Sequence, residues 1–180
     1  TVDPISGVPT LFGDWLTVRP DYVNQSSMEY QGIDWNWNKR VETENAGDFY
    51  INVLSSHIIA VYSKFDALSD EIEYLSSYTY EPRSQQNMSV SWVYQDFSTT
   101  LFVDRLGHME WGSRGKSDPH ITSNITTRYN YSPDLNVFFS IRNLDDKMPQ
   151  KDPGYGYPYY NQNYFSAFGR YYSAGFNYRF

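Results

Sequence analysis

The last stretch of the chain, residues 170–180, alternates strictly between two kinds of side chain. One parity consists of Tyr172, Ala174, Phe176, Tyr178 and Phe180, and the other of Tyr171, Ser173, Gly175, Asn177 and Arg179. A period of two predicts a β-strand with one apolar and one largely polar face. In water, such a strand at a chain end would fray or pair with other chains. Inside a bilayer, lipid would cover its apolar face and a closed sheet would satisfy its backbone.

Similar alternation predicts about six further strands upstream. They cover residues 26–39, 49–65, 86–95, 99–111, 121–131 and the stretch around 137–141. Residues 1–21 are rich in proline and glycine, which predicts a loop or an extracellular connection, with a strand over residues 10–19 as an alternative. The facing of 49–65 and of 99–111 stays open, because apolar residues occur at both parities of the first and charges blur the second.

The connections between these strands alternate in length. Short turns are expected around Glu44, Asp96–Ser98 and Pro133, and longer connections over residues 66–83, 112–119 and 145–168. Outer-membrane barrels have short periplasmic turns and longer external loops, and every short turn here falls on the side of the C-terminus. The pattern therefore predicts an all-β, antiparallel, up-and-down transmembrane β-barrel in the bacterial outer membrane.

Composition excludes several other classes. The net charge of −7 and the lack of a basic cluster argue against nucleic acid as a partner. The absence of cysteine excludes disulfides and Cys-based metal sites. No run approaches the roughly 20 apolar residues of a transmembrane helix, whereas aromatic residues reach 19%. Such a high aromatic content is typical of a surface that contacts both an apolar phase and water.

Three stretches resemble the C-terminal barrel of TonB-dependent outer-membrane receptors. They are Glu29-Tyr30-Gln31-Gly32-Ile33-Asp34, then Ile141-Arg142-Asn143-Leu144-Asp145-Asp146-Lys147-Met148-Pro149, and the ending that opens at Gly169-Arg170-Tyr171-Tyr172 and closes on Phe180. The similarity covers most of residues 22–180. The family commonly has an uncharged residue where this chain has Asp145.

The resemblance implies the C-terminal part of a Gram-negative transport receptor whose barrel has about 22 strands and a plugged lumen. Residues 22–180 would supply about seven of those strands. The implied function is uptake of a scarce nutrient, such as a siderophore, cobalamin or an oligosaccharide, without enzymatic activity or a cofactor. The implied partners are outer-membrane lipid, the barrel-assembly machinery, the plug and remaining strands, and TonB through an N-terminal part missing here. The alternatives are a soluble carbohydrate-binding β-protein and a self-contained small outer-membrane barrel of eight strands.

One loop is a candidate ligand site, because its rings fall outside any strand pattern on an expected external connection. These rings are Tyr155, Tyr157, Tyr159, Tyr160, Tyr164 and Phe165. Aromatic faces with polar tips bind sugars and chelates well, although rings in such a loop also form interfacial belts or pack on their neighbours. Five residues on expected lumen faces could contact solute or plug: Tyr30, Asp34, Asn36, Arg128 and Arg142.

No catalytic or metal site is expected. The three histidines, His57, His108 and His120, are scattered without ligand spacing, and the acidic stretch from Asp66 to Glu73 lacks the pattern of a strong Ca²⁺ loop. The resemblance gives the C-terminal strand a different role, as a signal read by the assembly machinery. Its residues would be Tyr172, Phe176, Tyr178 and Phe180, acting by strand addition.

Overall fold

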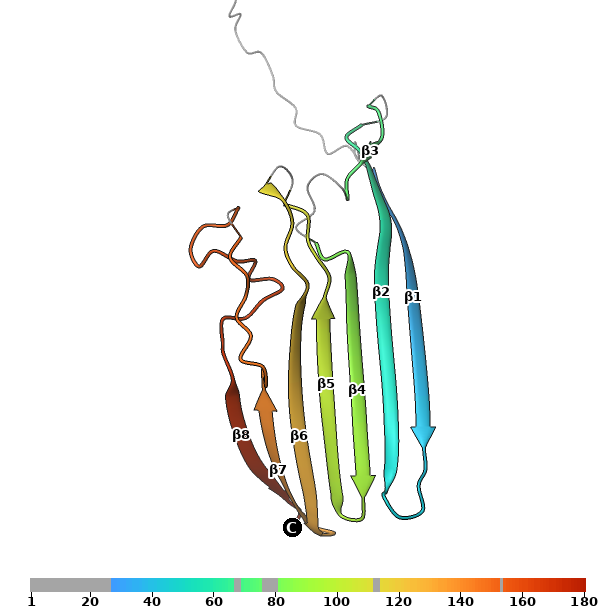
Figure 1. Cartoon of the computed structure of the whole chain (residues 1–180), viewed down its shortest axis with the longest axis vertical. Helices are drawn as coiled ribbons and strands as arrows, with labels where there is room; N and C mark the ends of the chain where they lie inside the picture. The colour runs from blue at the N-terminus through green and yellow to red at the C-terminus, as the bar shows by residue number, and fades with distance from the viewer. Residues whose placement is uncertain (1–26, 67–68, 76–80, 112–113, 153) are drawn as a thin grey trace, which may run out of the picture.

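The structure, a computed structural model, describes residues 27–66, 69–75, 81–111, 114–152 and 154–180. Its strands form one antiparallel sheet (Figure 1). They are β1 (Ser27–Val41), β2 (Asp48–Lys64), β3 (Ile72–Glu73), β4 (Ser84–Tyr94), β5 (Phe97–Leu106), β6 (His120–Ser132), β7 (Leu135–Arg142) and β8 (Tyr171–Tyr178). The all-β, antiparallel fold is confirmed. The loop over 1–21 and the alternative strand over 10–19 lie outside the described residues.

The strands follow one another across the sheet in chain order, β1-β2-β4-β5-β6-β7-β8, with the short β3 paired to β2 alone. This is the expected up-and-down topology. Among the described residues the sheet is open, since β1 pairs only with β2 and β8 only with β7. β1 and β8, the strands expected over residues 26–39 and 170–180, are therefore the two edges of the sheet. Within the described part of the chain, no helix has the length and apolar character needed to cross a membrane.

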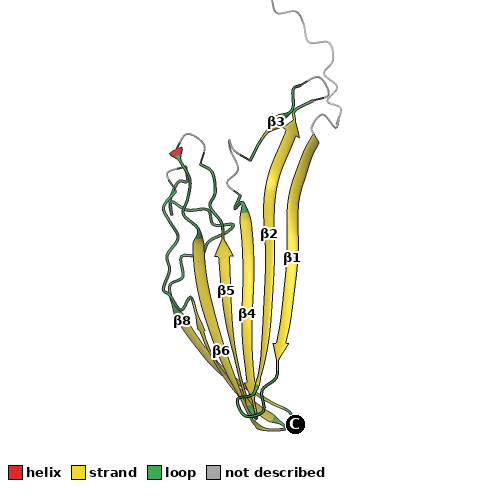
Figure 2. Ribbon diagram, turned by 45° about the vertical axis from the view of Figure 1, so that its right-hand side comes forward, coloured by secondary structure: helices red, strands yellow, loops and turns green. Residues whose placement is uncertain are grey.

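The three short turns lie at one end of the sheet together with the C-terminus, and the long connections lie at the other end (Figures 1 and 2). The expected alternation in connection length is thus confirmed. One turn was misplaced: it consists of Gln95 and Asp96 alone, and Phe97 already begins β5. Gln95 has a φ of 51°, a left-handed conformation that sequence patterns rarely assign to glutamine.

A β-bulge in β2 explains why its two parities were hard to separate. Gln31 lies opposite Ala60 and Gly32 opposite Ile58, so Ile59 is an extra residue. Because one extra residue moves the following side chains to the other face, apolar residues occupy both parities along β2. The facing of β2 therefore changes at Ile59.

The register places unlike residues on the two faces of the sheet, because residues directly opposite each other share a face. One row across six strands is apolar: Ile51, Val90, Leu101, Ile125, Ile141 and Tyr172. The neighbouring row, on the opposite face, is Tyr50, Ser91, Thr100, Thr126, Ser140 and Ser173. We call the first side the apolar face and the second the polar face. The facing of residues 99–106 is thereby settled, with Leu101 and Val103 on the apolar face. The expected end of this strand at residue 111 is wrong, because β5 ends at Leu106 and residues 107–111 belong to the following connection.

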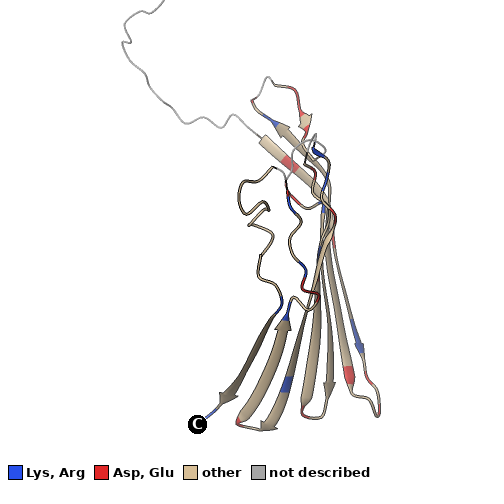
Figure 3. Ribbon diagram, turned by 60° about the vertical axis from the view of Figure 1, so that its left-hand side comes forward, with Lys and Arg blue, Asp and Glu red and all other residues tan. Residues whose placement is uncertain are grey.

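The apolar face covers only part of the length of the strands. On β4 it runs from Met88 to Tyr94, which at a rise of about 3.3 Å per residue spans about 20 Å. Toward the long loops it ends at a hydrogen-bonded polar row, in which Arg105 Nη1 donates to Gln86 Oε1 at 2.5 Å and Gln86 Nε2 donates to Ser55 Oγ at 3.3 Å. Most charged residues lie at strand ends and in loops (Figure 3).

Aromatic rings gather on the apolar face near the short turns. Trp92 stacks on Tyr94 with ring centroids 6.0 Å apart, and Phe97 meets Tyr129 at 4.5 Å. Among the described strands, contacts join only neighbours within the sheet, so no second layer covers this face. Val90 and Leu101 in its middle are half-buried by their neighbours, and Phe176 on the edge strand is 71% exposed. The buried apolar residues, Ala60, Val61, Leu75 and Met109, instead lie toward the end of the long loops. The strands therefore present an extended apolar surface that the chain does not bury.

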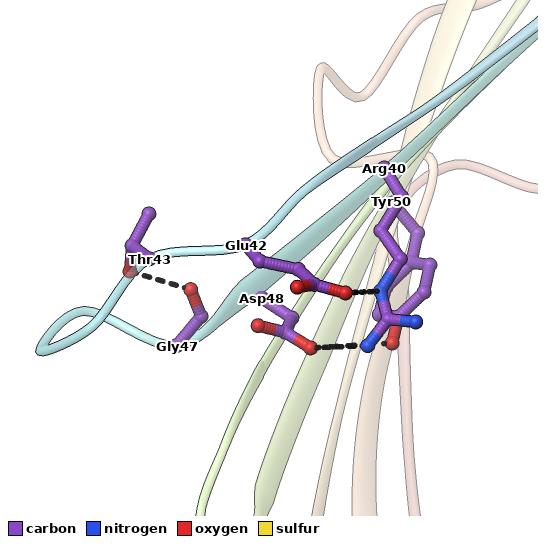
Figure 4. Close-up of polar contacts among 6 residues, drawn as sticks. All are labelled: Arg40, Glu42, Thr43, Gly47, Asp48 and Tyr50. Atoms are coloured by element: carbon purple, nitrogen blue, oxygen red, sulfur yellow. Dashed lines mark hydrogen bonds and ion pairs between the residues drawn. The ribbon is translucent and has the colours of Figure 1, made fainter.

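The β1–β2 turn is held on the polar face by Arg40 (Figure 4). Its guanidinium makes ion pairs with Glu42 at 3.1 Å and with Asp48 at 2.9 Å, and lies 5.2 Å from the centre of the Tyr50 ring. The bond to Asp48 joins the end of β1 to the start of β2. The turn is thereby fixed in one register.

The same turn is also held from its tip. Thr43 Oγ1 donates to the carbonyl oxygen of Gly47 at 2.7 Å, and Trp92 Nε1 on β4 donates to the carbonyl oxygen of Ala46 at 2.6 Å. Gly47 has a φ of 84°, and a Cβ there would collide with the Val93 carbonyl oxygen. Only glycine fits this position.

Candidate ligand site beneath the β7–β8 loop

A cavity of about 780 Å³, which we call the main cavity, lies between the polar face and the connection over residues 143–170, which we call the β7–β8 loop. The sheet contributes side chains from β4, β5, β6 and β7, among them Asn87, Phe102, Asp104, His120, Asn124 and Arg142. The loop contributes Lys147, Tyr164, Phe165 and Phe168, and β8 contributes Tyr171. The volume falls within the range typical of small-molecule sites.

On the floor of the cavity, the carboxylate of Asp104 accepts hydrogen bonds from two asparagine side chains. Asn87 Nδ2 donates to Asp104 Oδ1 at 2.6 Å, and Asn124 Nδ2 donates to Asp104 Oδ2 at 3.4 Å. Each oxygen of Asp104 thus accepts a hydrogen bond from a different strand. The register accounts for the cluster, because Asn87 lies directly opposite Asp104, and Asn124, which lies opposite Phe102 on the same face, reaches Asp104 diagonally.

The base of the β7–β8 loop is closed by Asn143. This residue follows β7 with a φ of 52°, a left-handed conformation that asparagine tolerates well. Its Oδ1 accepts from the Lys147 amide at 2.8 Å, and its Nδ2 donates to the carbonyl oxygens of Lys147 at 2.9 Å and Phe168 at 3.3 Å. The Asn143 backbone N–H donates to Asn124 Oδ1 at 2.9 Å, so the loop base is also anchored to the floor of the cavity.

Two aspartates strengthen the same loop base. Asp146 Oδ1 accepts from the Arg170 amide at 2.7 Å, which brings the end of the loop beside its start. Asp145 Oδ2 accepts from the Ser123 backbone N–H at 3.1 Å and from the Ser123 hydroxyl. The segment from Asn143 to Lys147 thus has a local structural role, which is to fold the β7–β8 loop over the polar face.

Rings and cations share the cavity wall. The Arg142 guanidinium lies 5.8 Å from the centre of the Tyr171 ring, and the His120 and Phe165 rings meet edge to face at 4.9 Å. Tyr164 is half-buried, and burial, with a smaller contribution from the Glu81 carboxylate, raises the pKa of its phenol. Its hydroxyl therefore remains a hydrogen-bond donor at neutral pH.

A second, smaller cavity of about 240 Å³ lies between the β7–β8 loop and the connection over residues 107–119. Met109, Asp152 and Asn161 in its wall are almost completely buried. His120, Lys147 and Phe165 line both cavities, so the two spaces share one wall.

The five predicted tyrosines do not act as one group. Tyr164 lines the main cavity, and Tyr160 lines a separate hollow of about 440 Å³ with Phe165 and Phe168. Tyr157 is 87% exposed, and its ring meets that of Tyr159 at 6.0 Å. Tyr155, Tyr157 and Tyr159 line neither of these spaces. Whether any of the five binds a ligand stays a prediction.

The residues expected on the lumen side lie on the polar face. Asp34 and Asn36 line a hollow of about 340 Å³ on it, and Arg142 lines the main cavity. Arg128 lies opposite Ser98 and Phe138, close to the short turns. Tyr30 lies two residues before Gly32 on β1, at the end of the long loops. The sequence did not single out Asp104, His120 or Lys147 as wall residues, because their proximity arises from the register and the loop fold.

The four residues expected to act as an assembly signal share the apolar side of the terminal strand. Tyr172 lies opposite Ile141, Phe176 opposite Val137, and Tyr178 opposite Leu135. The Phe180 ring meets the Tyr178 ring edge to face at 5.0 Å. All four are exposed.

No group of three or more His, Asp and Glu side chains gathers to hold a metal among the residues that the structure describes. His57 and His120 lie on strands, and His108 pairs with Glu110 at 3.4 Å. Asp66 Oδ1 accepts from the Ser69 amide and hydroxyl, each at 2.7 Å, a local contact between a side chain and the residue three positions on. The side chains of the main cavity offer charges, amides and rings to a ligand.

Comparisons with protein-family models, with curated proteins and with solved structures find no match for this chain.

Proposed function

We propose that this chain is the C-terminal part of the barrel of a TonB-dependent outer-membrane receptor, which takes up a scarce nutrient such as a siderophore, cobalamin or an oligosaccharide. In this proposal the apolar face contacts outer-membrane lipid and the polar face lines a water-filled lumen. The remaining strands and the plug complete the receptor, TonB is its partner, and the barrel-assembly machinery inserts the receptor into the membrane. The chain itself performs no enzymatic reaction.

The observation that carries the proposal is the contrast between adjacent rows of the sheet. The row containing Leu101 is apolar across six strands, and the row containing Thr100 is hydroxylic or polar across the same strands. A soluble sheet buries its apolar face against another layer, whereas this one leaves it exposed. The apolar band is about 20 Å tall, with rings at the short-turn edge and a polar row at the long-loop edge. This fits the roughly 25 Å band of outer-membrane barrels.

Two open edges support a part of a large barrel over a self-contained small one. A closed barrel of these strands would need β1 and β8 to pair with each other, and here each has one neighbour. Lipid does not satisfy free backbone N–H and C=O groups, so both edges need partner strands. The isolated chain is therefore expected to aggregate or to associate with other chains.

Site-directed spin labelling of the intact protein in outer-membrane vesicles tests the membrane orientation. The chain contains no cysteine, so Leu101→Cys and Thr100→Cys each give a single label within it. A label at 101 is expected to relax rapidly with oxygen, which concentrates in lipid. A label at 100 is expected to respond to a water-soluble nickel chelate.

The opposite pattern, or equal water access at both positions, would exclude the membrane orientation. It would favour a soluble β-protein, of which a carbohydrate-binding module with rings in its cavity is the best alternative. Titration with an oligosaccharide series would then be the direct test of that alternative.

A further inference from the structure

The charges in the wall of the main cavity are unequal. Among the residues that line it, the basic side chains are Arg142 and Lys147, and the acidic one is Asp104. Neither Arg142 nor Lys147 makes an ion pair with any residue that the structure describes. The lining of this cavity thus carries one positive charge in excess, in a chain whose net charge is −7.

The acid in the cavity wall, Asp104, forms no ion pair with either cation. Asp104 accepts hydrogen bonds from Asn87 at 2.6 Å and from Asn124 at 3.4 Å, which employ both of its oxygens. Each amide donor comes from a neighbouring strand, so the carboxylate is held on the floor of the sheet. The two cations remain available to a ligand.

The guanidinium of Arg142 and the backbone of Lys147 are held by fixed parts of the fold. Arg142 ends β7, and its guanidinium lies 5.8 Å from the centre of the Tyr171 ring on β8. Stacking on a ring face leaves the N–H groups at the edge of a guanidinium free to donate. Lys147 is held at the loop base by two hydrogen bonds between its backbone and the Asn143 side chain.

The rest of the wall is apolar or aromatic. Phe165 and Phe168 come from the loop, Phe102 from β5 and Leu106 from the end of the same strand. Rings of this kind bind the flat or apolar part of a ligand. A neutral sugar would leave both cations without a counter-charge, which weakens binding relative to an anion.

We propose that this cavity receives a ligand that carries an anionic group beside an apolar or aromatic body. Arg142 and Lys147 bind the anionic group, and Phe165 and Phe168 contact the body. The inference rests on the proposed function in one respect, since it takes the polar face as the water-filled side of the sheet.

Two probes of equal size, naphthalene-2-sulfonate and the neutral naphthalene-2-sulfonamide, test this assignment. Each is titrated calorimetrically into the intact protein in a non-ionic detergent, with protein-free micelles as the blank. The sulfonate is expected to bind about tenfold more tightly or better, because hydrogen bonds to charged groups are the stronger ones. Raising the salt concentration should weaken binding of the sulfonate and leave the sulfonamide unchanged.

The double variant R142Q/K147Q should remove the preference for the sulfonate, so that the two probes bind with equal affinity. R128Q is the matched control, since Arg128 lies on the same face but outside this cavity. Equal binding of the two probes to the unaltered protein, no binding of either, or an equal loss in R128Q would each overturn the proposal. The two proposals can fail separately. If the protein preferred the sulfonate but the spin label at residue 101 were exposed to water, this binding site would stand and the membrane orientation would be rejected.

Discussion

Asn143 Nδ2 lies 3.3 Å from the carbonyl oxygen of Phe168, across 25 positions of sequence. The same amide donates to the Lys147 carbonyl oxygen, and its oxygen accepts from the Lys147 amide. One side chain therefore joins both ends of the β7–β8 loop and fixes the loop over the cavity. Short polar segments with such a role are easily taken for ligand contacts.

Replacing Asn143 with glycine is expected to loosen the loop without disturbing the sheet. Glycine retains the φ of 52° at no steric cost, so the change removes the side-chain hydrogen bonds alone. Losing hydrogen bonds of this kind costs about 1 kcal/mol each, which predicts exchange of the Lys147 amide about tenfold faster or more. Hydrogen exchange measured by mass spectrometry would show it as faster labelling over residues 143–170.

The control is Asn163→Gly, at an exposed asparagine of the same loop. It should leave exchange of the Lys147 amide unchanged. Unaltered protection in Asn143→Gly would mean that the loop is held by other contacts and that the role assigned to Asn143 is wrong.

Gly175 and Phe138 form a second close pair, opposite each other on β8 and β7. A Cβ on Gly175 would lie 2.8 Å from two carbon atoms of the Phe138 ring, so alanine there forces the ring to move. Overpacking of this kind typically costs about 1–3 kcal/mol, more than the about 0.5–1 kcal/mol that alanine gains over glycine in a strand. Gly175→Ala should therefore lower the free energy of unfolding, measured by urea titration of the intact protein in detergent.

A double-mutant cycle isolates this contact. With Phe138→Ala in place the collision disappears, and Gly175→Ala should then stabilise by about 0.5–1 kcal/mol. The sign of the effect is thus expected to reverse between the two backgrounds. An identical effect in both would show that the ring does not cover Gly175.

Much of the sheet could be predicted from the sequence because its side chains alternate cleanly. All seven long strands were expected, and so were the three short turns, since each turn combines polar residues with an interruption of the alternation. The misplaced β4–β5 turn depended on Gln95 taking a left-handed conformation, which its residue type does not favour. The two-residue β3 had no signal of its own, because it forms by pairing with β2 in the middle of an acidic connection.

The candidate site was predictable only in part. Arg142 could be assigned to the polar face from alternation, whereas the link between Asn87, Asp104 and Asn124 required the register of three strands. Predicting the fold of the β7–β8 loop would have required knowledge of the hydrogen bonds within the loop itself. Its backbone hydrogen bonds place Tyr164 over the sheet while leaving Tyr157 exposed, and no periodic pattern distinguishes these two rings.

A charge on the apolar face should be costly if that face contacts lipid. Val90→Arg is expected to lower the free energy of unfolding in lipid vesicles by about 2–4 kcal/mol, the cost of an arginine near the middle of a bilayer on a barrel surface. Ser89→Arg, one residue away on the polar face, should cost far less. Urea unfolding followed by tryptophan fluorescence measures both. Equal costs at the two positions would contradict a lipid-facing Val90.

The terminal strand provides a test of assembly apart from ligand binding. Tyr178 and Phe180 lie together on the apolar face, and the Arg179 backbone N–H continues the pairing with β7 by donating to the Asp134 carbonyl oxygen at 2.9 Å. If the assembly machinery recognises alternate side chains of the added strand, Phe180→Asp should sharply lower the amount of intact protein inserted in the outer membrane.

Ligand binding by the inserted molecules should change little, because Phe180 does not line the cavity. Arg179→Ser keeps the backbone bond and should affect neither quantity. Quantitative blotting of outer-membrane fractions compares the two variants, and equal insertion would show that the facing of this strand does not control assembly.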